Sequence, residues 1–256
     1  MGDSNSGPDG GATSNPLIDP GTMCLNTSSA PGPTCNFLQF HKNDEITPIA
    51  IYMASEMNGN AHGPDVARMA ELNGFSADAC IDDFTKLPLW QKLIGAGITP
   101  EQCVNMGMTY GTAALVSWGL NVRQDGEWDH KPKIARRFHP RSSSVQHWHL
   151  YGYTLYYYDV WSNIHYGYVG TAAGFSASVL LDGAGLEQMG STLLRGKLPT
   201  KSTGVPGLQA WDTPQDRAGI MMGINLYRAK PRSVTAGELV RLVTTSNAIN
   251  KKPYVP

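Results

Sequence analysis

The chain has 256 residues, of which 41% are hydrophobic and 16% are charged, and its formal net charge at pH 7 is -1. This composition is typical of a globular protein. A balance so close to neutral argues against a broad electrostatic surface for nucleic acid or an anionic membrane, although basic residues between positions 131 and 141 form a local cluster.

The first part of the chain differs in composition from the rest. Residues 1–36 are rich in Gly, Ser, Pro, Asn and Asp with isolated apolar residues, which predicts a linker or arm ahead of one domain at 37–256. We find no basic-then-apolar signal peptide, and no apolar run approaches the roughly 18 to 20 residues that span a bilayer. We therefore expect no membrane-spanning segment. Export of the protein would need machinery that does not rely on a signal peptide.

Four cysteines are present, and their spacing is not that of a metal site. No CxxC occurs, which argues against a zinc knuckle. Cys24 with Cys35 and Cys80 with Cys103 could each form a disulfide, or could remain as free buried thiols. Paired cysteines would favour an oxidising compartment such as the periplasm.

The first predicted helix contains an unusual carboxylate. Thr47 followed by Pro48 predicts an N-cap and first helical residue, and the helix is expected to stop at Asn58-Gly59-Asn60. Glu56 falls on the apolar stripe of this helix. Burial there would raise the pKa of a carboxyl group, as a general acid requires.

Asp65 follows Glu56 across a polar turn. A helix ending in Glu, then a turn, then Asp resembles the acid pair of phage-type lysozymes. A purely structural role is also open for each carboxylate. Glu56 could pair with an Arg or cap a backbone amide, and Asp65 could simply occupy the first turn of the next helix.

Further helices are expected from Pro64 to Gly74, from Thr99 onward with a capping box, from Thr213, and over residues 235–249. Residues 145–159 are rich in aromatics and predict an extended strand or hairpin. The expected fold class is α+β, predominantly α-helical, lysozyme-like with a small aromatic-rich hairpin or sheet.

A second group of chemically active residues lies at 127–134. Asp129 could orient His130 or hold a catalytic water, while the alternative is a turn fixed by Pro132 with Trp128 in the core.

The third group is residues 156–175. Aromatic rings around Asp159 suit stacking on sugars, although aromatics are also core material, and His165 is either a hydrogen-bonded core residue or a catalyst. Gly167, Gly170 and Gly174 form a smooth strip against which another backbone could pack. The substrate-binding candidates of both groups are His130, Asp159, Asn163, His165, Tyr166 and Tyr168.

A pair of histidines could bind a metal ion. His147 and His149 would share one face of a strand, with a third ligand such as His130 or Asp129 needed from elsewhere. No motif of fixed spacing accompanies the pair, so we assign no metal and no cofactor.

Three motifs together resemble the polymorphic toxin type 44 family: WDHKPKI, YYYDVWSNIHYGYVGTAAGF and DTPQDRAGIMMGINLY. The resemblance covers roughly residues 45–228 and implies that the domain at 37–256 is a toxin domain. It implies a C-terminal effector module of a larger polypeptide, delivered into competing bacteria by a specialised secretion system and opposed by an immunity protein.

The residues favour peptidoglycan over nucleic acid as the partner of such a toxin. We expect a glycoside hydrolase, a lysozyme-like muramidase acting in the periplasm of target bacteria. Glu56 would protonate the glycosidic oxygen, and Asp65, or failing it Asp129 or Asp159, would stay ionised. The alternatives are an RNase that uses His130 or His165, and a non-catalytic peptidoglycan-binding module.

Overall fold

A computed structural model describes residues 44–140, 146–184 and 212–255 of the chain. The chain divides into two units, Met1–Lys42 and Asn43–Pro256, and every described residue belongs to the second. The predicted N-terminal linker at 1–36 and the proposed Cys24–Cys35 pair therefore lie outside the described residues.

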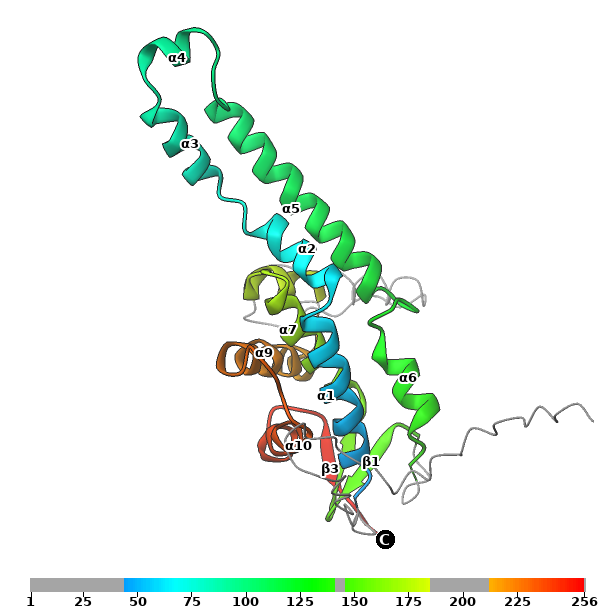
Figure 1. The fold of residues 1–256 in the computed structure, drawn as a ribbon. Helices are drawn as coiled ribbons and strands as arrows, with labels where there is room; N and C mark the ends of the chain where they lie inside the picture. Colours follow the sequence, from blue (N-terminus) through cyan, green and yellow to red (C-terminus); the bar gives the residue numbers. More distant parts are fainter. Residues whose placement is uncertain (1–43, 141–145, 185–211, 256) are drawn as a thin grey trace, which may run out of the picture. The chain divides into compact units, whose positions relative to one another are not determined.

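The described part is mostly helical with one small sheet, which confirms the predicted α+β, predominantly α-helical class (Figure 1). The lysozyme-like part of that expectation stays a prediction. Residues 177–184 are also helical. The named elements are α1 (Thr47–Ala61), α2 (Pro64–Asn73), α3 (Ala77–Lys86), α4 (Leu89–Leu93), α5 (Pro100–Val122), α6 (His130–Arg137), β1 (Trp148–Tyr151), β2 (Thr154–Tyr157), α7 (Asp159–Ala172), α9 (Pro214–Ala229), α10 (Ala236–Thr245) and β3 (Lys251–Pro253).

Threonine caps begin three of the predicted helices. Thr99, Thr213 and Thr235 each accept a hydrogen bond from the backbone N–H three residues later, which satisfies an amide with no partner inside the helix. The capping box expected for α5 is present, and α2 ends at Gly74 as predicted.

The expected ends of α1 were wrong. The cap position is Ile46, and the Asp44 carboxylate accepts hydrogen bonds from both the backbone N–H and the hydroxyl of Thr47. The helix also continues through the Asn/Gly run to Ala61. The run did not end the helix because two of its side chains have tertiary partners: Asn58 pairs with the backbone of Val234, and Asn60 with His165.

Helices α7 and α9 cross with their backbones in contact (Figure 1). A Cβ on Gly167 would lie 2.0 Å from the carbonyl oxygen of Ile220, and one on Gly223 would lie 2.1 Å from that of Ile164. Neither position has room for a side chain. The predicted glycine strip is thus used at Gly167 against a backbone, while Gly170 faces the Leu180 and Trp118 side chains.

The aromatic segment forms a β-hairpin, as predicted. Strands β1 and β2 pair antiparallel, and β3 from the C-terminal end of the chain adds to β2. The sheet is tied to the start of α1, since the backbone N–H of Glu45 donates to Leu150 and the Leu150 N–H donates to the Glu45 carboxylate. The hairpin therefore holds the entry to α7, which follows β2 directly.

Helices α3 and α4 and the first half of α5 form a hairpin that we call the arm. Its two long helices are joined by a Cys80–Cys103 disulfide, and none of the α3 residues is buried. The second half of α5 instead reaches the main core, where Trp118 packs with Trp128 and Phe175. Within the described residues, none of the helices combines the length and apolarity needed to cross a membrane.

Candidate functional site

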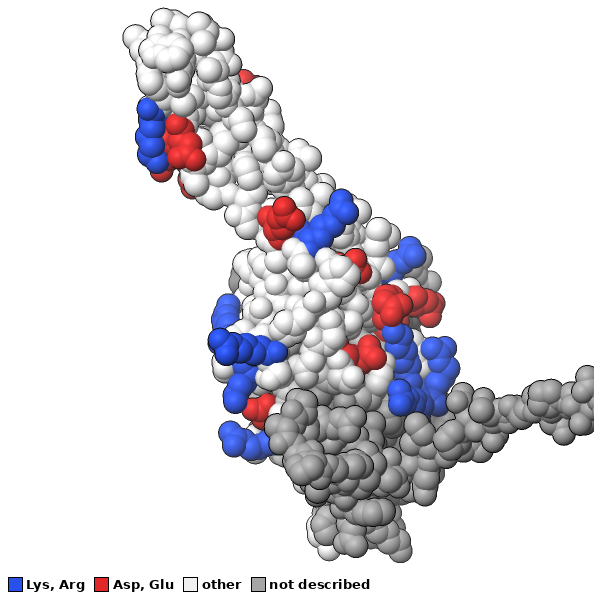
Figure 2. Space-filling view, viewed as in Figure 1, with Lys and Arg blue, Asp and Glu red and all other residues white. Residues whose placement is uncertain are grey.

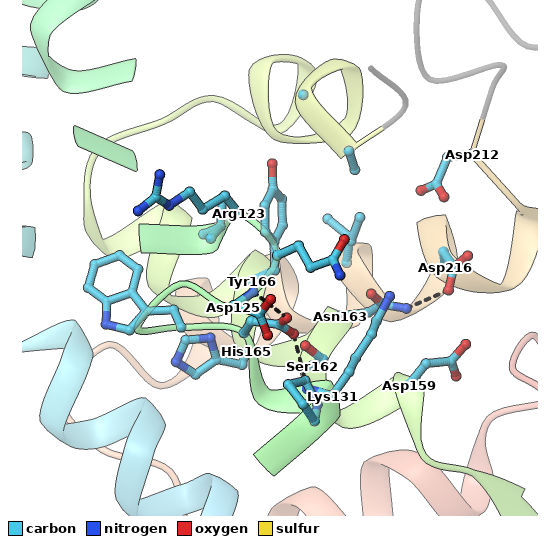
Figure 3. Close-up of a pocket in the computed structure, with 18 of the residues that line it drawn as sticks. Arg123, Asp125, Lys131, Asp159, Ser162, Asn163, His165, Tyr166, Asp212 and Asp216 are labelled. Atoms are coloured by element: carbon cyan, nitrogen blue, oxygen red, sulfur yellow. Dashed lines mark hydrogen bonds between the residues drawn. The ribbon is translucent and has the colours of Figure 1, made fainter. Parts of the chain in front are cut away.

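A pocket of about 880 Å³ lies where α5, α6, α7 and α9 meet (Figure 3). Its size is within the range of small-molecule sites. Besides aromatic and apolar residues, the lining contains these charged groups and pocket histidines: Arg123, Asp125, Asp129, Lys131, His147, Asp159, His165, Asp212 and Asp216.

Three carboxyl groups occupy one side of the pocket. Asp159 lies in the first turn of α7, Asp216 in the first turn of α9, and Asp212 just before the α9 cap. Asp216 accepts hydrogen bonds from the Asn163 amide at 2.6 Å and from the Thr213 hydroxyl at 2.7 Å. Figure 3 shows Asp216 between the other two carboxyl groups.

Both outer carboxyl groups of this trio titrate near neutral pH. Burial raises the pKa of Asp159 to about 7, and the Asp216 charge and a hydrogen bond with Asp216 act in the same direction. Burial and the Asp216 charge also raise the pKa of Asp212 to about 7. Each group can therefore exchange a proton at physiological pH.

Lys131 supplies a positive charge to this side of the pocket. Its ammonium group lowers the pKa of both Asp159 and Asp212, opposing the larger effect of burial. In Figure 3 the Lys131 side chain extends from α6 toward Asn163 and Asp216. The pocket thus combines carboxyl groups that hold protons with one cation placed among them.

Aromatic rings form much of the remaining lining. Trp118 packs against Trp128 and Tyr166, with ring centroids 5.5 Å and 5.0 Å apart. His147 stacks on Tyr158 at 4.5 Å, near the start of α7. Such flat apolar faces beside carboxyl groups fit a substrate made of rings with hydroxyl groups.

Two buried histidines form a pair, of which His165 lines the pocket and His130 does not. The His130 and His165 ring centroids are 4.1 Å apart, and His130 Nδ1 lies 3.0 Å from the Tyr52 hydroxyl. The Asn60 amide donates to His165 Nε2 at 2.9 Å. Burial, with a smaller effect of Lys133, lowers the pKa of His130 to about 3. Burial and the neighbouring His130 lower the pKa of His165 well below its ordinary value, so both rings are neutral at pH 7.

The three predicted catalytic residues are in different places. Glu56 lies half-buried within α1, beside the buried stripe, and does not line this pocket. Asp65 is exposed in the first turn of α2, also outside the pocket. Asp129 does line the pocket, but its carboxylate caps α6 by accepting from the Lys131 N–H and binds the Asp125 N–H as well.

The predicted substrate-binding residues are partly brought together. Asp159, Asn163, His165 and Tyr166 all line the pocket. His130 lies behind His165, and His130 Nε2 has no hydrogen-bond partner among the described residues.

Tyr168 is a core residue instead. Its ring is fully buried, and its hydroxyl donates to the Lys230 carbonyl oxygen at 2.8 Å. It packs on α9, where its ring centroid lies 5.1 Å from that of Tyr227.

The expected histidine pair on β1 does not form. His147 precedes the strand with a φ of 75° and lines the pocket, whereas His149 is buried and its Nε2 bonds the Phe138 carbonyl. Because His147 has a positive φ, its side chain does not follow the regular alternation of side chains along a strand. The two histidines therefore do not share a face. In the described ranges, no three His, Cys, Asp or Glu side chains are grouped to hold a metal ion.

Sequence reasoning missed Asp212 and Asp216 as site residues. Both belong to the motif DTPQD, in which Asp216 fits a capping interaction with Thr213 that it does make. Only the crossing of α7 and α9 places them beside Asp159. The sequence signal for these two site residues was a pair of aspartates on either side of a predicted helix start.

Part of the chain matches a known protein family. Residues 117–229 match the family model described as bacterial toxin 44. The match includes all three motifs that carry the predicted resemblance and every residue labelled in Figure 3. It begins at residue 117, not near residue 45 as expected. No curated protein and no solved structure matches the chain. The site therefore lies within the part of the chain that matches bacterial toxin 44.

Proposed function

We propose that this chain contains an antibacterial toxin domain that hydrolyses the glycan strands of peptidoglycan as a muramidase. The observation that carries the proposal is the pair of pocket carboxyl groups, Asp159 and Asp212, whose pKa values are raised to about 7 on either side of Asp216. Glycoside hydrolysis uses one carboxyl group as acid and one as base or nucleophile. In this proposal Asp159 replaces Glu56 as the general acid.

Asp159 is the better acid because its environment keeps a proton on it. Burial disfavours its charged form, and its hydrogen bond with Asp216 favours the protonated form. A pKa of about 7 lets the group donate efficiently at neutral pH and recover its proton afterwards. Glu56 lies outside the pocket that such a reaction requires.

Asp212 is the matching base. Asp216 is engaged by Asn163 and Thr213 through its two oxygens, which favours a positioning role for that carboxylate. Asp212 has a pKa of about 7, so its ionised fraction can accept a proton from water near neutrality. At working pH the active form has Asp159 protonated and Asp212 ionised.

Hydrolysis takes one proton from Asp159 and adds one proton to Asp212. Asp159 gives its proton to the glycosidic oxygen as the bond from that oxygen to the anomeric carbon breaks. Water attacks the anomeric carbon, and Asp212 takes a proton from that water. The negative charge of Asp216 stabilises the oxocarbenium-like transition state. A final proton exchange with solvent restores Asp159 and Asp212.

The pocket lining supports a glycan in preference to RNA. Among its lining residues, five aspartates face two non-histidine cations, Arg123 and Lys131, an excess that opposes a phosphate backbone. Aromatic rings supply stacking surfaces for sugars. Lys131 lines the same pocket and can donate hydrogen bonds to the hydroxyl and carbonyl oxygens of a glycan.

The buried histidines do not favour the RNase alternative. An acid–base ribonuclease needs one imidazolium to protonate the leaving group. The pKa of His130 is about 3 and that of His165 is well below its ordinary value, so neither ring is an imidazolium at neutral pH.

The wider context supports delivery into competitors. The match to bacterial toxin 44 favours a toxin that is carried by a larger effector and opposed by an immunity protein. The Cys80–Cys103 disulfide is of the kind that persists in oxidising compartments such as the periplasm. We therefore propose action on the cell wall from the periplasmic side.

The decisive experiment measures clearing of purified sacculi and release of reducing ends. We expect Asp159→Asn and Asp212→Asn to lower the rate by about 100-fold or more, the size of a lost acid or base. The matched control is Glu71→Gln, because Glu71 is an exposed carboxylate on α2 outside the pocket. This variant should keep the wild-type rate.

Glu56→Gln separates the two assignments of the acid. Loss of activity in Glu56→Gln with full activity in Asp159→Asn would return the role to Glu56. Degradation of RNA with intact sacculi would establish the RNase alternative. Binding to sacculi without cutting would establish the non-catalytic module.

A further inference from the structure

The end of the arm exposes a cluster of large apolar side chains. We call residues 87–98, between α3 and α5, the apex. Its exposed members are Leu89 (73%), Trp90 (61%), Leu93 (78%), Ile94 (71%) and Ile98 (45%). A contiguous apolar cluster of this kind marks a binding surface more often than a scatter of single residues does.

The apex contains a single charged residue, and that charge is turned away from the cluster. The Lys92 ammonium donates to the Thr85 carbonyl at 2.7 Å and lies 5.5 Å from the Phe84 ring centroid, both on α3. Figure 2 shows the end of the arm without charged groups on the visible face. The apex therefore presents apolar groups to its surroundings.

Acidic residues lie directly behind the apex. Asp82 and Asp83 are exposed near the end of α3, and Glu101 is exposed in the first turn of α5. Lys86 pairs with Asp83 at 3.3 Å. The arm thus has an apolar end followed by a zone with an excess of negative charge, which anionic surfaces would repel.

The apex is held in place by its base. The Cys80–Cys103 disulfide joins α3 to α5, and Gly95 and Gly97 have φ values of 73° and 89° that close the connection. A Cβ at Gly97 would lie 2.5 Å from Leu87 Cδ1, so the Leu87 side chain would have to shift to accept it. The apolar groups are therefore presented together on a preformed turn.

We propose that the apex inserts into the interfacial layer of a zwitterionic phospholipid bilayer. The apolar groups lie at the end of a projecting hairpin, where a bilayer can contact all of them at once. Trp90 is suited to the boundary between headgroups and acyl chains. The acidic zone behind the apex selects zwitterionic over anionic lipid. This inference rests on the arm alone and does not depend on the muramidase proposal.

The test is flotation of the full chain with pure phosphatidylcholine vesicles, compared with vesicles that also contain phosphatidylglycerol. We expect binding to phosphatidylcholine that weakens as phosphatidylglycerol is added at low salt. The double variant Trp90→Ser/Leu93→Ser should lose about tenfold or more in partitioning, because burying one large apolar side chain already corresponds to about that factor.

Two matched variants isolate the effect. Trp90→Phe/Leu93→Met keeps the apolar character and should bind like wild type. Val116→Ser removes an exposed apolar group of α5 outside the apex and should also bind like wild type. All replaced residues are exposed, so an unchanged thermal midpoint checks that folding is intact.

Three outcomes would overturn the proposal. One is the absence of vesicle binding by wild type. Another is equal binding by wild type and Trp90→Ser/Leu93→Ser. The third is a dimer in light scattering that this double variant dissociates, which would assign the apex to a second copy of the chain.

Discussion

At the scale of single residues, Asp159 connects the function of the pocket with the stability of the protein. Its pKa is raised from 3.8 to about 7, so the folded state binds more protons than the unfolded state between these values. The free energy of unfolding contributed by this group therefore falls as pH rises through that range and stays low above pH 7. A group arranged to hold a proton for catalysis thus destabilises the fold when ionised.

This predicts that Asp159→Asn is more stable than wild type at pH 8. The amide keeps a donor for Asp216 and cannot ionise, so the thermal midpoint should rise by about 3 °C or more at pH 8 and change little at pH 4. Calorimetry at both pH values measures this. A lower midpoint for the variant at pH 8 would contradict the assignment of a raised pKa to Asp159.

At the scale of secondary-structure elements, the crossing of α7 and α9 builds the site. Gly167 and Gly223 allow the two backbones to touch, and the contact holds the first turn of α7 beside the first turn of α9. Those turns contain Asp159 and Asp216. The glycines take no part in the chemistry, but they determine the separation of the carboxyl groups.

We predict that Gly223→Ala costs about 1 to 3 kcal/mol of stability, because the added methyl meets a backbone carbonyl that cannot move aside. The activity on sacculi should fall as well, since the helices must separate. Gly111→Ala in α5 is the control: no atom lies within 4 Å of its added Cβ, so stability should stay level or rise by about 0.5 to 1 kcal/mol. Urea unfolding of the two variants measures both effects. Equal destabilisation in the two would argue against a tight crossing.

At the scale of the whole described region, the arm and the core are stabilised differently. The core is a contiguous set of buried apolar residues from α1, α7, α9 and α10, whereas α3 buries none of its residues. The arm instead relies on the Cys80–Cys103 disulfide and on packing between α3 and α5.

The variant Cys80→Ser/Cys103→Ala should therefore loosen the arm without unfolding the core. A disulfide that closes a loop of this length contributes about 3 kcal/mol of stability. Its removal should therefore lower the hydrogen-exchange protection of residues 77–98 by about 100-fold. Exchange measured by mass spectrometry on peptides from the arm and from α7 tests this. A comparable loss of protection in α7 would show that the two parts unfold together.

The sequence by itself determined the local features. Caps at Thr99, Thr213 and Thr235, the aromatic hairpin and the toxin-like motifs follow from residues close together in the chain, where hydrogen bonds and periodicity act over a few positions. It also placed Asp159, Asn163, His165 and Tyr166 in one segment, all of which reach the pocket.

Only the tertiary structure decided which carboxyl groups meet. Glu56 and Asp65 are close in sequence, but Glu56 lies beside the stripe of α1 and Asp65 faces solvent on α2. Asp212 and Asp216 are distant from Asp159 in sequence and yet join it through the α7–α9 crossing. Desolvation and charge repulsion, which tune these groups toward neutral pH, depend on distances that no local pattern encodes.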